Sequence, residues 1–261
     1  MEIDWSLAKK ITLWHYDELI IKLLNTLAYS FVHEYYNHGM ADAEDYSEKL
    51  QHHYLLNGKE ATFIGEITAQ FESLNMLGIK NYTDLLQKID TKAKCEIFLK
   101  IAGLNFEALI HLLHFLYRWV LPFKCPLKEL TDLLPTEKEQ LSVIRKHKIT
   151  SNLDILEYWR KKEARIEFAQ MTGLEENYLL QLTHRADISR LAYVRGKTIK
   201  HLCAAGYDTL NKLASAHISQ INADMTEYFA KMGKNFNDFK AVLPLDWMIG
   251  GACVLPKIVE V

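Results

Sequence analysis

The sequence predicts an all-α protein. Hydrophobic residues make up 49% of the 261 residues and charged residues 25%, values that are ordinary for a globular chain. Only five prolines and eleven glycines interrupt it, too few for an all-β chain with many turns. Apolar residues recur mainly at three- and four-residue steps, and few segments alternate strictly between apolar and polar residues. Helices joined by short turns account for both observations.

Residues 1–60 are predicted to form a helical section of their own. Apolar side chains follow helical spacing over residues 5–38, as one long or two shorter helices, and the pattern resumes over residues 41–54 after Gly39. This section carries five Lys and Arg residues against ten Asp and Glu residues, a net charge of −5 in a chain of net charge −2. We therefore expect an acidic helical section in front of a second region, residues 61–261.

The second region contains an internal repeat. Residues 79–121 align with residues 149–191 at an offset of 70 without a gap. The identical pairs are mostly apolar residues or glycine, and they include Ile79/Ile149, Asp84/Asp154, Leu86/Leu156, Phe98/Phe168, Gly103/Gly173, Leu104/Leu174, Leu109/Leu179, Leu112/Leu182, His114/His184 and Leu121/Leu191. Such self-similarity indicates a duplicated supersecondary unit, in which the paired glycines each end a helix.

Three hairpins are predicted around these connectors, near residues 63–79, 133–149 and 191–207. The clearest is the third, where the run LAYVRGKTIKHLCAAGYDTLNKL combines a tight turn at 194–196, a helix and a glycine stop at Gly206. This is the layout of a helix-hairpin-helix, a motif whose turn can present backbone N–H groups to a phosphate. We therefore predict tandem degenerate helix-hairpin-helix units with connecting helices, preceded by the helical N-terminal section.

Two runs near the third hairpin carry a family resemblance. The sequences ADISRLAYV at residues 186–194 and AAGYDTLNKLA at residues 204–214 resemble a bacterial and archaeal family of tandem degenerate helix-hairpin-helix repeats. The C-terminal stretch from Asp246 to Glu260 is similar to the closing Trp-to-Leu-Pro segment of that family. The resemblance covers about residues 63–261. The family is known only as a domain of unknown function, so the resemblance implies a fold and no activity.

The candidate nucleic-acid contacts lie at the third hairpin. They are Arg190, Arg195, Gly196, Lys197 and Lys200, and they belong to a run from Arg185 to His201 in which Asp187 is the only acidic residue. A basic face beside a hairpin is what contact with phosphates requires. The alternative is a solvated helix surface with ordinary Lys and Arg usage.

None of the three hairpins keeps the two glycines through which DNA-binding hairpins usually bring backbone N–H groups to a phosphate. The equivalent positions hold Gly65 and Ile67 in the first copy, Pro135 and Glu137 in the second, and Tyr193 and Arg195 in the third. Proline lacks the donor and glutamate repels phosphate. Phosphate contact is therefore expected only through the side chains of the third hairpin.

We identify no catalytic constellation, metal site or cofactor motif. His33, Glu34 and His38 do not form the HExxH pattern, because the second histidine lies five residues after the first. A metal site there would need ligands from separate helices, with Asp42, His52 and His53 as the further candidates, and a solvated polar face is the simpler interpretation. Catalysis by Lys197 or Lys200 would need a neighbour that lowers the lysine pKa, and the sequence names none.

The remaining features predict a cytoplasmic protein without a membrane span. The cysteines Cys95, Cys125, Cys203 and Cys253 are widely spaced among apolar neighbours, which indicates buried free thiols in a reducing compartment. The N-terminus has no secretory signal pattern. The most apolar stretch, residues 106–122, is short and contains charged and histidine residues, so we expect a buried core helix.

Binding rather than catalysis is the expected function, and two hypotheses remain open. The first is contact with DNA or RNA phosphates through the third hairpin. The second is a protein–protein interaction scaffold that has kept the hairpin fold and lost the phosphate site. The absent glycines, the near-neutral net charge and the acidic N-terminal section favour the second hypothesis, whereas the basic run favours the first.

Overall fold

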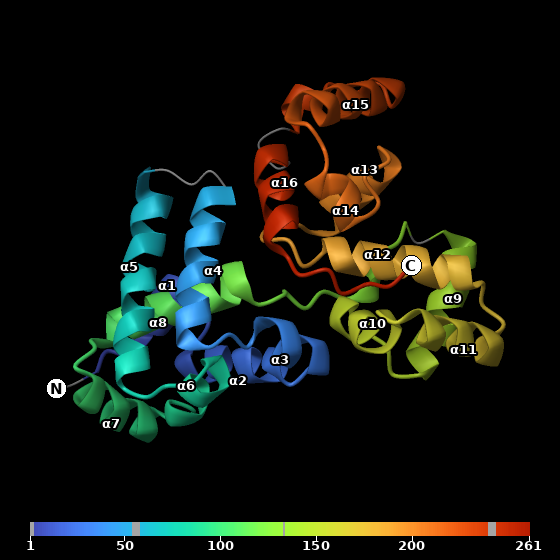
Figure 1. Ribbon diagram of the computed structural model, residues 1–261. Helices are drawn as coiled ribbons and strands as arrows, with labels where there is room; N and C mark the ends of the chain where they lie inside the picture. Colours follow the sequence, from blue (N-terminus) through green and yellow to red (C-terminus); the bar gives the residue numbers. More distant parts are fainter. Residues whose placement is uncertain (1–2, 54–57, 133, 240–243) are drawn as a thin grey trace. The chain divides into compact units, whose positions relative to one another are not determined.

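The computed structural model describes residues 3–53, 58–132, 134–239 and 244–261, and this part of the chain is helical, without a β-strand (Figure 1). The all-α prediction is confirmed. The chain folds into two compact units. Unit 1 spans residues 1–52 and 56–122, and unit 2 spans residues 53–55 and 123–261. The boundaries of these units reflect which residues pack together. The boundary predicted from the sequence, at residue 60, reflects a change in net charge.

Unit 1 begins with short helices that cover the first copy of the repeat. Its helices are α1 (Ser6–Thr12), α2 (Tyr16–Leu27), α3 (Ser30–Tyr36), α4 (Met40–His53), α5 (Gly58–Met76), α6 (Tyr82–Lys88), α7 (Lys92–Ala102), α8 (Phe106–Phe115) and a π-helical turn (Leu116–Val120). The N-terminal pattern forms three helices instead of one or two, because Leu13 adopts a left-handed backbone (φ 71°) and Tyr29 an extended one. Helix α1 packs against α8, and α2 packs against α6.

The two copies of the repeat contain matching helices. In unit 2, α10 (Asn152–Trp159), α11 (Lys162–Thr172) and α12 (Glu176–Ile188) begin at the residues equivalent to the starts of α6, α7 and α8. The side chains of Asn81 and Ser151 accept hydrogen bonds from the backbone N–H groups of Asp84 and Asp154, at 3.0 and 3.3 Å. Both aspartates also accept a backbone N–H, from Lys80 and Thr150, at 2.9 Å. Capping therefore explains why this aspartate is identical in both copies.

The turn expected at the start of the first hairpin does not form. Residues 63–65 are helical and lie inside α5. Ile64, Ile67, Phe71 and Leu74 follow helical spacing and are fully buried, so they form one continuous apolar stripe along this helix. A single glycine inside a helix costs only about 1 kcal/mol relative to alanine. Burial of the stripe outweighs that cost, and Gly65 does not interrupt the helix.

Unit 2 places the second copy of the repeat among further short helices. They are a 3-10 turn (Leu127–Glu129), α9 (Pro135–Lys146), α13 (Gly196–Ala204), α14 (Leu210–Ala214), α15 (Ile218–Lys231), a 3-10 turn (Phe236–Asp238) and α16 (Leu245–Val254). Helix α10 packs against α12, and α14 packs against α16 (Figure 1). The C-terminal residues form no strand; instead the backbone N–H of Glu260 donates to the carbonyl oxygen of Arg160 at 2.8 Å.

Arg165 is a fully buried cation on α11 that joins three parts of unit 2. Its Nε donates to Glu176 Oε1 at 3.1 Å, its Nη1 donates to the carbonyl oxygen of Trp159 at 2.9 Å, and its Nη2 donates to the carbonyl oxygen of Glu260 at 2.7 Å. A buried charge is tolerated when its hydrogen bonds are satisfied in this way. The end of α10, the start of α12 and the C-terminal segment are thereby held at one side chain.

The four cysteines are free thiols, and two of them are less buried than expected. Cys95 and Cys125 are buried and Cys203 is half-buried, whereas Cys253 is exposed. Met248, Gly251 and Ala252 lie on the buried face of α16. Residue 253 comes directly after this face, and the rotation of the helix from one residue to the next turns its side chain toward the surface. An apolar neighbourhood in the sequence therefore did not place this side chain inside.

In the described part of the chain, no single helix has the length and apolar composition needed to cross a membrane. The segments Lys92–Ala102 and Phe106–Val120 reach that length and composition only as a pair, which bends by 108° at the break. Within α8, the side chains of Leu109, Leu112 and Phe115 are buried, as predicted for a core helix.

The substitution Arg165→Met is expected to lower the free energy of unfolding by about 3 kcal/mol, because it leaves the buried carbonyl oxygen of Trp159, the half-buried carbonyl oxygen of Glu260 and the Glu176 carboxylate without their donor. Urea unfolding followed by circular dichroism would measure the change. Lys161→Met, at an exposed position just before the same helix, serves as the control. A loss no greater than that of the control would show that the Arg165 network does not stabilise unit 2.

Candidate functional site

The third turn is closed by its own backbone. After α12, the N–H of Leu191 donates to Ile188 O at 3.1 Å, and the N–H of Val194 donates to Leu191 O at 3.2 Å. Tyr193 adopts a left-handed backbone with φ of 64°, a conformation that few residues other than glycine take. Helix α13 then begins at Gly196. Two of the backbone donors that a hairpin would offer to a phosphate are thus used within the turn.

Gly196 is the point of closest packing between α13 and the 3-10 turn Leu127–Glu129. A Cβ atom at position 196 would lie 2.7 Å from the carbonyl oxygen of Glu129 and 3.1 Å from its Cα. Neither atom can move without shifting the backbone. The requirement for glycine at this predicted site residue is therefore explained by packing inside unit 2.

Arg190 is directed into the interior. It is 5% exposed, and its Nε donates to Asp187 Oδ1 at 2.8 Å while Nη2 donates to the carbonyl oxygen of Pro256 at 2.9 Å. Burial raises the pKa of the Asp187 carboxyl, and the Arg190 guanidinium opposes that rise. This pair fixes the end of α12 to the C-terminal segment, so Arg190 is not positioned to meet a ligand at the surface.

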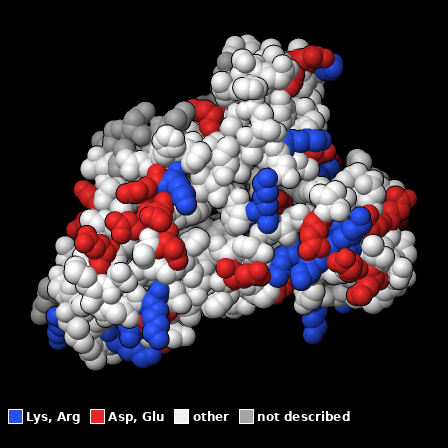
Figure 2. Space-filling model, in the orientation of Figure 1, with Lys and Arg blue, Asp and Glu red and all other residues white. Residues whose placement is uncertain are grey.

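The other candidate cations lie near the start of α13 with different surroundings. The guanidinium of Arg195 stacks over the Phe123 ring at 4.0 Å, and its Nη1 donates to Val194 O at 2.7 Å. Lys200 Nζ lies 3.7 Å from Asp132 Oδ1, and Lys197 is exposed. On the face shown in Figure 2, acidic and basic side chains are interspersed over the region of α10 to α12.

The nearby thiols and imidazoles are in their neutral forms at pH 7. Burial raises the pKa of Cys125 to about 12 and that of Cys203 to about 11. Burial lowers the pKa of His184 and of His201 below the usual value of 6.5. These groups therefore supply neither a thiolate nucleophile nor an additional positive charge to the third turn.

The N-terminal histidines do not converge on one point. His33 Nε2 lies 3.1 Å from Asn37 Nδ2, and the His38 ring stacks on Tyr46 with 4.9 Å between centroids. Burial lowers the pKa of His38. Over the residues that the structure describes, no group of three or more His, Cys, Asp or Glu side chains could hold a metal ion.

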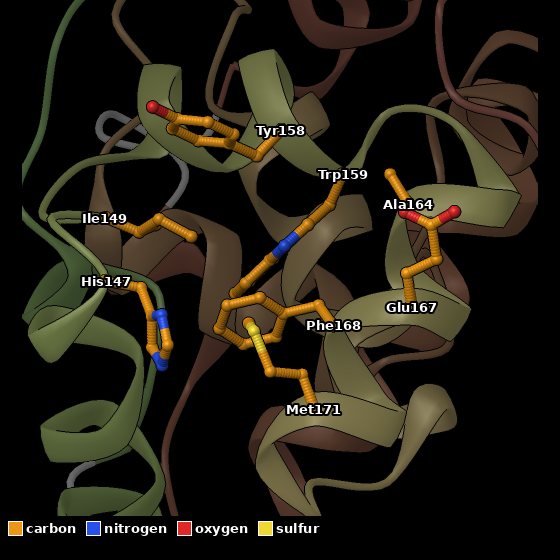
Figure 3. A pocket seen from close by; sticks show the side chains of 8 residues that line it. All are labelled: His147, Ile149, Tyr158, Trp159, Ala164, Glu167, Phe168 and Met171. Carbon is orange, nitrogen blue, oxygen red and sulfur yellow. The ribbon is translucent and has the colours of Figure 1, made fainter.

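An open pocket of about 360 Å³ lies between the end of α9, the end of α10 and α11 (Figure 3). Its lining residues are His147, Ile149, Tyr158, Trp159, Ala164, Glu167, Phe168 and Met171. The Trp159 and Phe168 rings pack with 4.8 Å between centroids, and His147 meets Phe168 edge-on at 5.1 Å. These rings give the pocket an aromatic wall.

The rim of this pocket is unusually apolar for a surface. The side chains of Tyr158 and Met171 are 57% and 62% exposed, and Figure 3 shows Tyr158 and Met171 at opposite ends of the group, with Phe168 between them. Glu167 supplies one carboxylate beside the rings. Exposed apolar groups around a concave site mark binding surfaces more often than isolated surface residues do. The pocket is the strongest candidate binding site in unit 2.

No sequence pattern predicted this pocket. Of its lining residues, the repeat marked Ile149 and Phe168, as identities with Ile79 and Phe98. A usable signal was Met171, an apolar residue that follows the buried Phe168 by three positions at the end of the helix. The lining residues come from α10, from α11 and from the segment that follows α9, and only folding brings these parts together.

Comparison with known proteins concerns unit 2. Residues 133–237 match a family model described as Domain of unknown function (DUF4332). The match is narrower than the predicted resemblance over residues 63–261, and it contains both the third turn and the aromatic pocket. No curated protein and no solved structure matches the chain.

Gly196→Ala is expected to lower the free energy of unfolding by about 2 kcal/mol, because the added Cβ would collide with the Glu129 backbone. Gly65→Ala is the matched control, since a Cβ there meets nothing within 4 Å and α5 should gain up to about 1 kcal/mol. Denaturant unfolding of both variants would measure the difference. Equal stability of the two variants would contradict the packing role of Gly196.

Proposed function

We propose that this chain is a non-catalytic protein-binding module of the helix-hairpin-helix type that no longer uses its third hairpin to bind phosphate. The observation that carries the proposal is the open aromatic pocket between α10 and α11. A fold maintains exposed apolar side chains around a hollow at a cost in solubility, which binding would offset. The equivalent starts of α6 to α8 and α10 to α12 support the tandem-unit part of the proposal.

The partner best suited to this pocket is a peptide or protein segment with a bulky apolar side chain. The volume of about 360 Å³ lies near the lower end of the range for ligand pockets, about 300–1,000 Å³. The aromatic wall would bury the apolar group, and the exposed Met171 could adapt its shape to it because methionine is flexible. Glu167 would favour a partner with a cationic or N–H group next to that apolar residue.

Nucleic-acid binding remains the second candidate function, and one observation favours it. Lys197 is exposed at the first turn of α13, next to Arg195 and one turn before Lys200. These three side chains could contact phosphates from the surface. Against it stand the buried Arg190, the stacking of Arg195 on Phe123 and the packing of Gly196 on Glu129.

Short duplex and single-stranded DNA and RNA are expected not to bind the chain at physiological salt. Fluorescence anisotropy across a salt series would test this, with the double variant Arg195→Glu/Lys197→Glu measured beside the unchanged protein. Binding that weakens steeply with salt and disappears in the double variant would overturn the proposal and assign phosphate contact to the third turn.

Peptides selected from a displayed library on the full chain are expected to carry a bulky apolar residue and to need the aromatic pocket. Met171→Glu should weaken their binding about tenfold, because it places a charge on the apolar rim. Gln170→Glu adds the same charge to the same helix at an exposed residue outside the pocket, and it should leave the affinity within about twofold. Selected peptides that bind both variants equally would remove the pocket from the proposal.

A further inference from the structure

The start of α11 in unit 2 already holds a carboxylate, and this carboxylate belongs to the C-terminal segment of the chain. The backbone N–H of Lys162, the first residue of α11, donates to Glu260 Oε2 at 3.2 Å. Lys162 Nζ donates to the backbone oxygen of Val261 at 3.5 Å. Free N–H groups and the helix dipole make the first turn of a helix favourable for an anion.

The equivalent place in unit 1 is the start of α7. Lys92 corresponds to Lys162 at the offset of 70, and each is the first residue of an eleven-residue helix. Lys92 borders an open pocket of about 420 Å³, lined by Trp5, Ser6, Lys9, Lys10, His15 and Lys92. Three lysines therefore line a pocket that borders the residue equivalent to the Glu260-binding Lys162.

We call this pocket the lysine pocket. Its polar surroundings suit an anion. Lys9 Nζ lies 3.4 Å from His15 Nε2, and none of the described carboxylates pairs with Lys9. Lys10 pairs with Asp4 at 3.3 Å and Lys92 pairs with Asp17 at 3.7 Å. Both pairs are exposed, so another carboxylate can readily replace those partners, and neither aspartate lines the pocket.

The aromatic side of the lysine pocket is held in place. The Trp5 ring meets the rings of Tyr16 and Phe106 edge-on, with 4.9 Å between centroids in each case. Lys92 Nζ lies 5.3 Å from the centroid of the Trp5 ring. A ligand here would find a fixed apolar surface beside the ammonium groups, a combination that suits a peptide better than a free inorganic ion.

The two copies differ in which side chain donates a hydrogen bond to the carbonyl oxygen at the end of the preceding helix. In unit 2, Arg165 donates to the carbonyl oxygen of Trp159, whereas in unit 1 the equivalent residue is Cys95 and the Tyr16 hydroxyl donates to the equivalent carbonyl oxygen of Ile89. The N-terminal helices therefore take over one contact of the buried arginine. They also place the Asp17 carboxylate 3.7 Å from Lys92 Nζ, but this carboxylate is exposed and does not line the pocket.

We propose that the lysine pocket binds the carboxylate of an acidic, extended peptide segment from a partner protein, as α11 binds Glu260. The backbone N–H and Nζ of Lys92 and the Nζ of Lys9 would receive the carboxylate, and Trp5 would contact an apolar neighbour of the acidic residue. This site lies in unit 1 and does not depend on the aromatic pocket of unit 2.

The probe is a synthetic peptide with the sequence of residues 255–261, LPKIVEV, acetylated and amidated so that its glutamate is the only carboxylate. Calorimetric titration into the full chain at low salt is expected to show binding. Replacing the peptide glutamate by glutamine, or introducing Lys9→Gln/Lys92→Gln in the protein, should weaken it about tenfold, the effect of losing a charge-assisted hydrogen bond.

The matched control is Lys49→Gln/Lys100→Gln, which removes two exposed lysines of unit 1 outside the pocket and should change the affinity less than about twofold. Lys162→Gln tests whether the peptide instead displaces the C-terminal segment of the chain. No binding by the unchanged protein, or a loss in Lys162→Gln without a loss in Lys9→Gln/Lys92→Gln, would overturn the proposal. Displacement of the peptide by inorganic phosphate at equal concentration would also overturn it, because the site would then be a general anion site.

Discussion

The buried guanidinium of Arg165 is the interaction on which the arrangement of unit 2 depends. A cation removed from water must have its donors satisfied, and here the acceptors are the nearby Trp159 and Glu176 and, 95 residues further along the chain, Glu260. Meeting that requirement brings the C-terminal segment to α11, where the Glu260 carboxylate also caps the helix. Unit 1 has Cys95 at the equivalent position and needs no such segment. The difference between Arg165 and Cys95 therefore accompanies two different helix starts: Glu260 accepts from the first N–H of α11, whereas the Thr91 side chain accepts from the N–H of Lys94 in α7.

The need to satisfy buried hydrogen-bonding groups also explains a basic residue of the third turn, Arg190. Arginine offers several donors in a fixed plane, so a buried arginine often serves the fold by joining carbonyl oxygens and carboxylates. Arg190 does this with Asp187 and Pro256, and Asn152 does it without charge by bonding Cys125, Phe123 and Ser189. The number of positive residues in a stretch of sequence does not distinguish a cation that faces water from one that holds two segments together.

Much of the fold could be predicted because its signals are local. Helix caps at Asp84 and Asp154 and stops at Gly103 and Gly173 lie within a few residues of the groups that they satisfy. The prediction that the first hairpin turns at Gly65 and Ile67 was wrong, because the burial of a long apolar stripe in α5 outweighs the cost of one glycine. The aromatic pocket could not be predicted, because the periodicity of α10 and α11 indicates which side chains face inward and not which part of that face stays uncovered. Trp159 and Phe168 are largely buried even though they line an opening, so burial alone does not mark them as pocket residues.

The balance between a protein partner and a nucleic-acid partner is decided by how many cations can act together. Binding to duplex DNA gains its strength from the release of counterions, with a salt dependence of about −0.9 per phosphate neutralised. Arg190 is buried, so Arg195, Lys197 and Lys200 remain as the possible contacts of the third turn. Three contacts give a slope of only about −3, far below that of proteins with six to ten contacts. Burial of an apolar side chain against Trp159 and Phe168 has no such dependence on salt, and it needs only one well-formed pocket. The cations of the third turn and the aromatic pocket of unit 2 therefore support the proposal of a protein partner over that of a nucleic-acid partner.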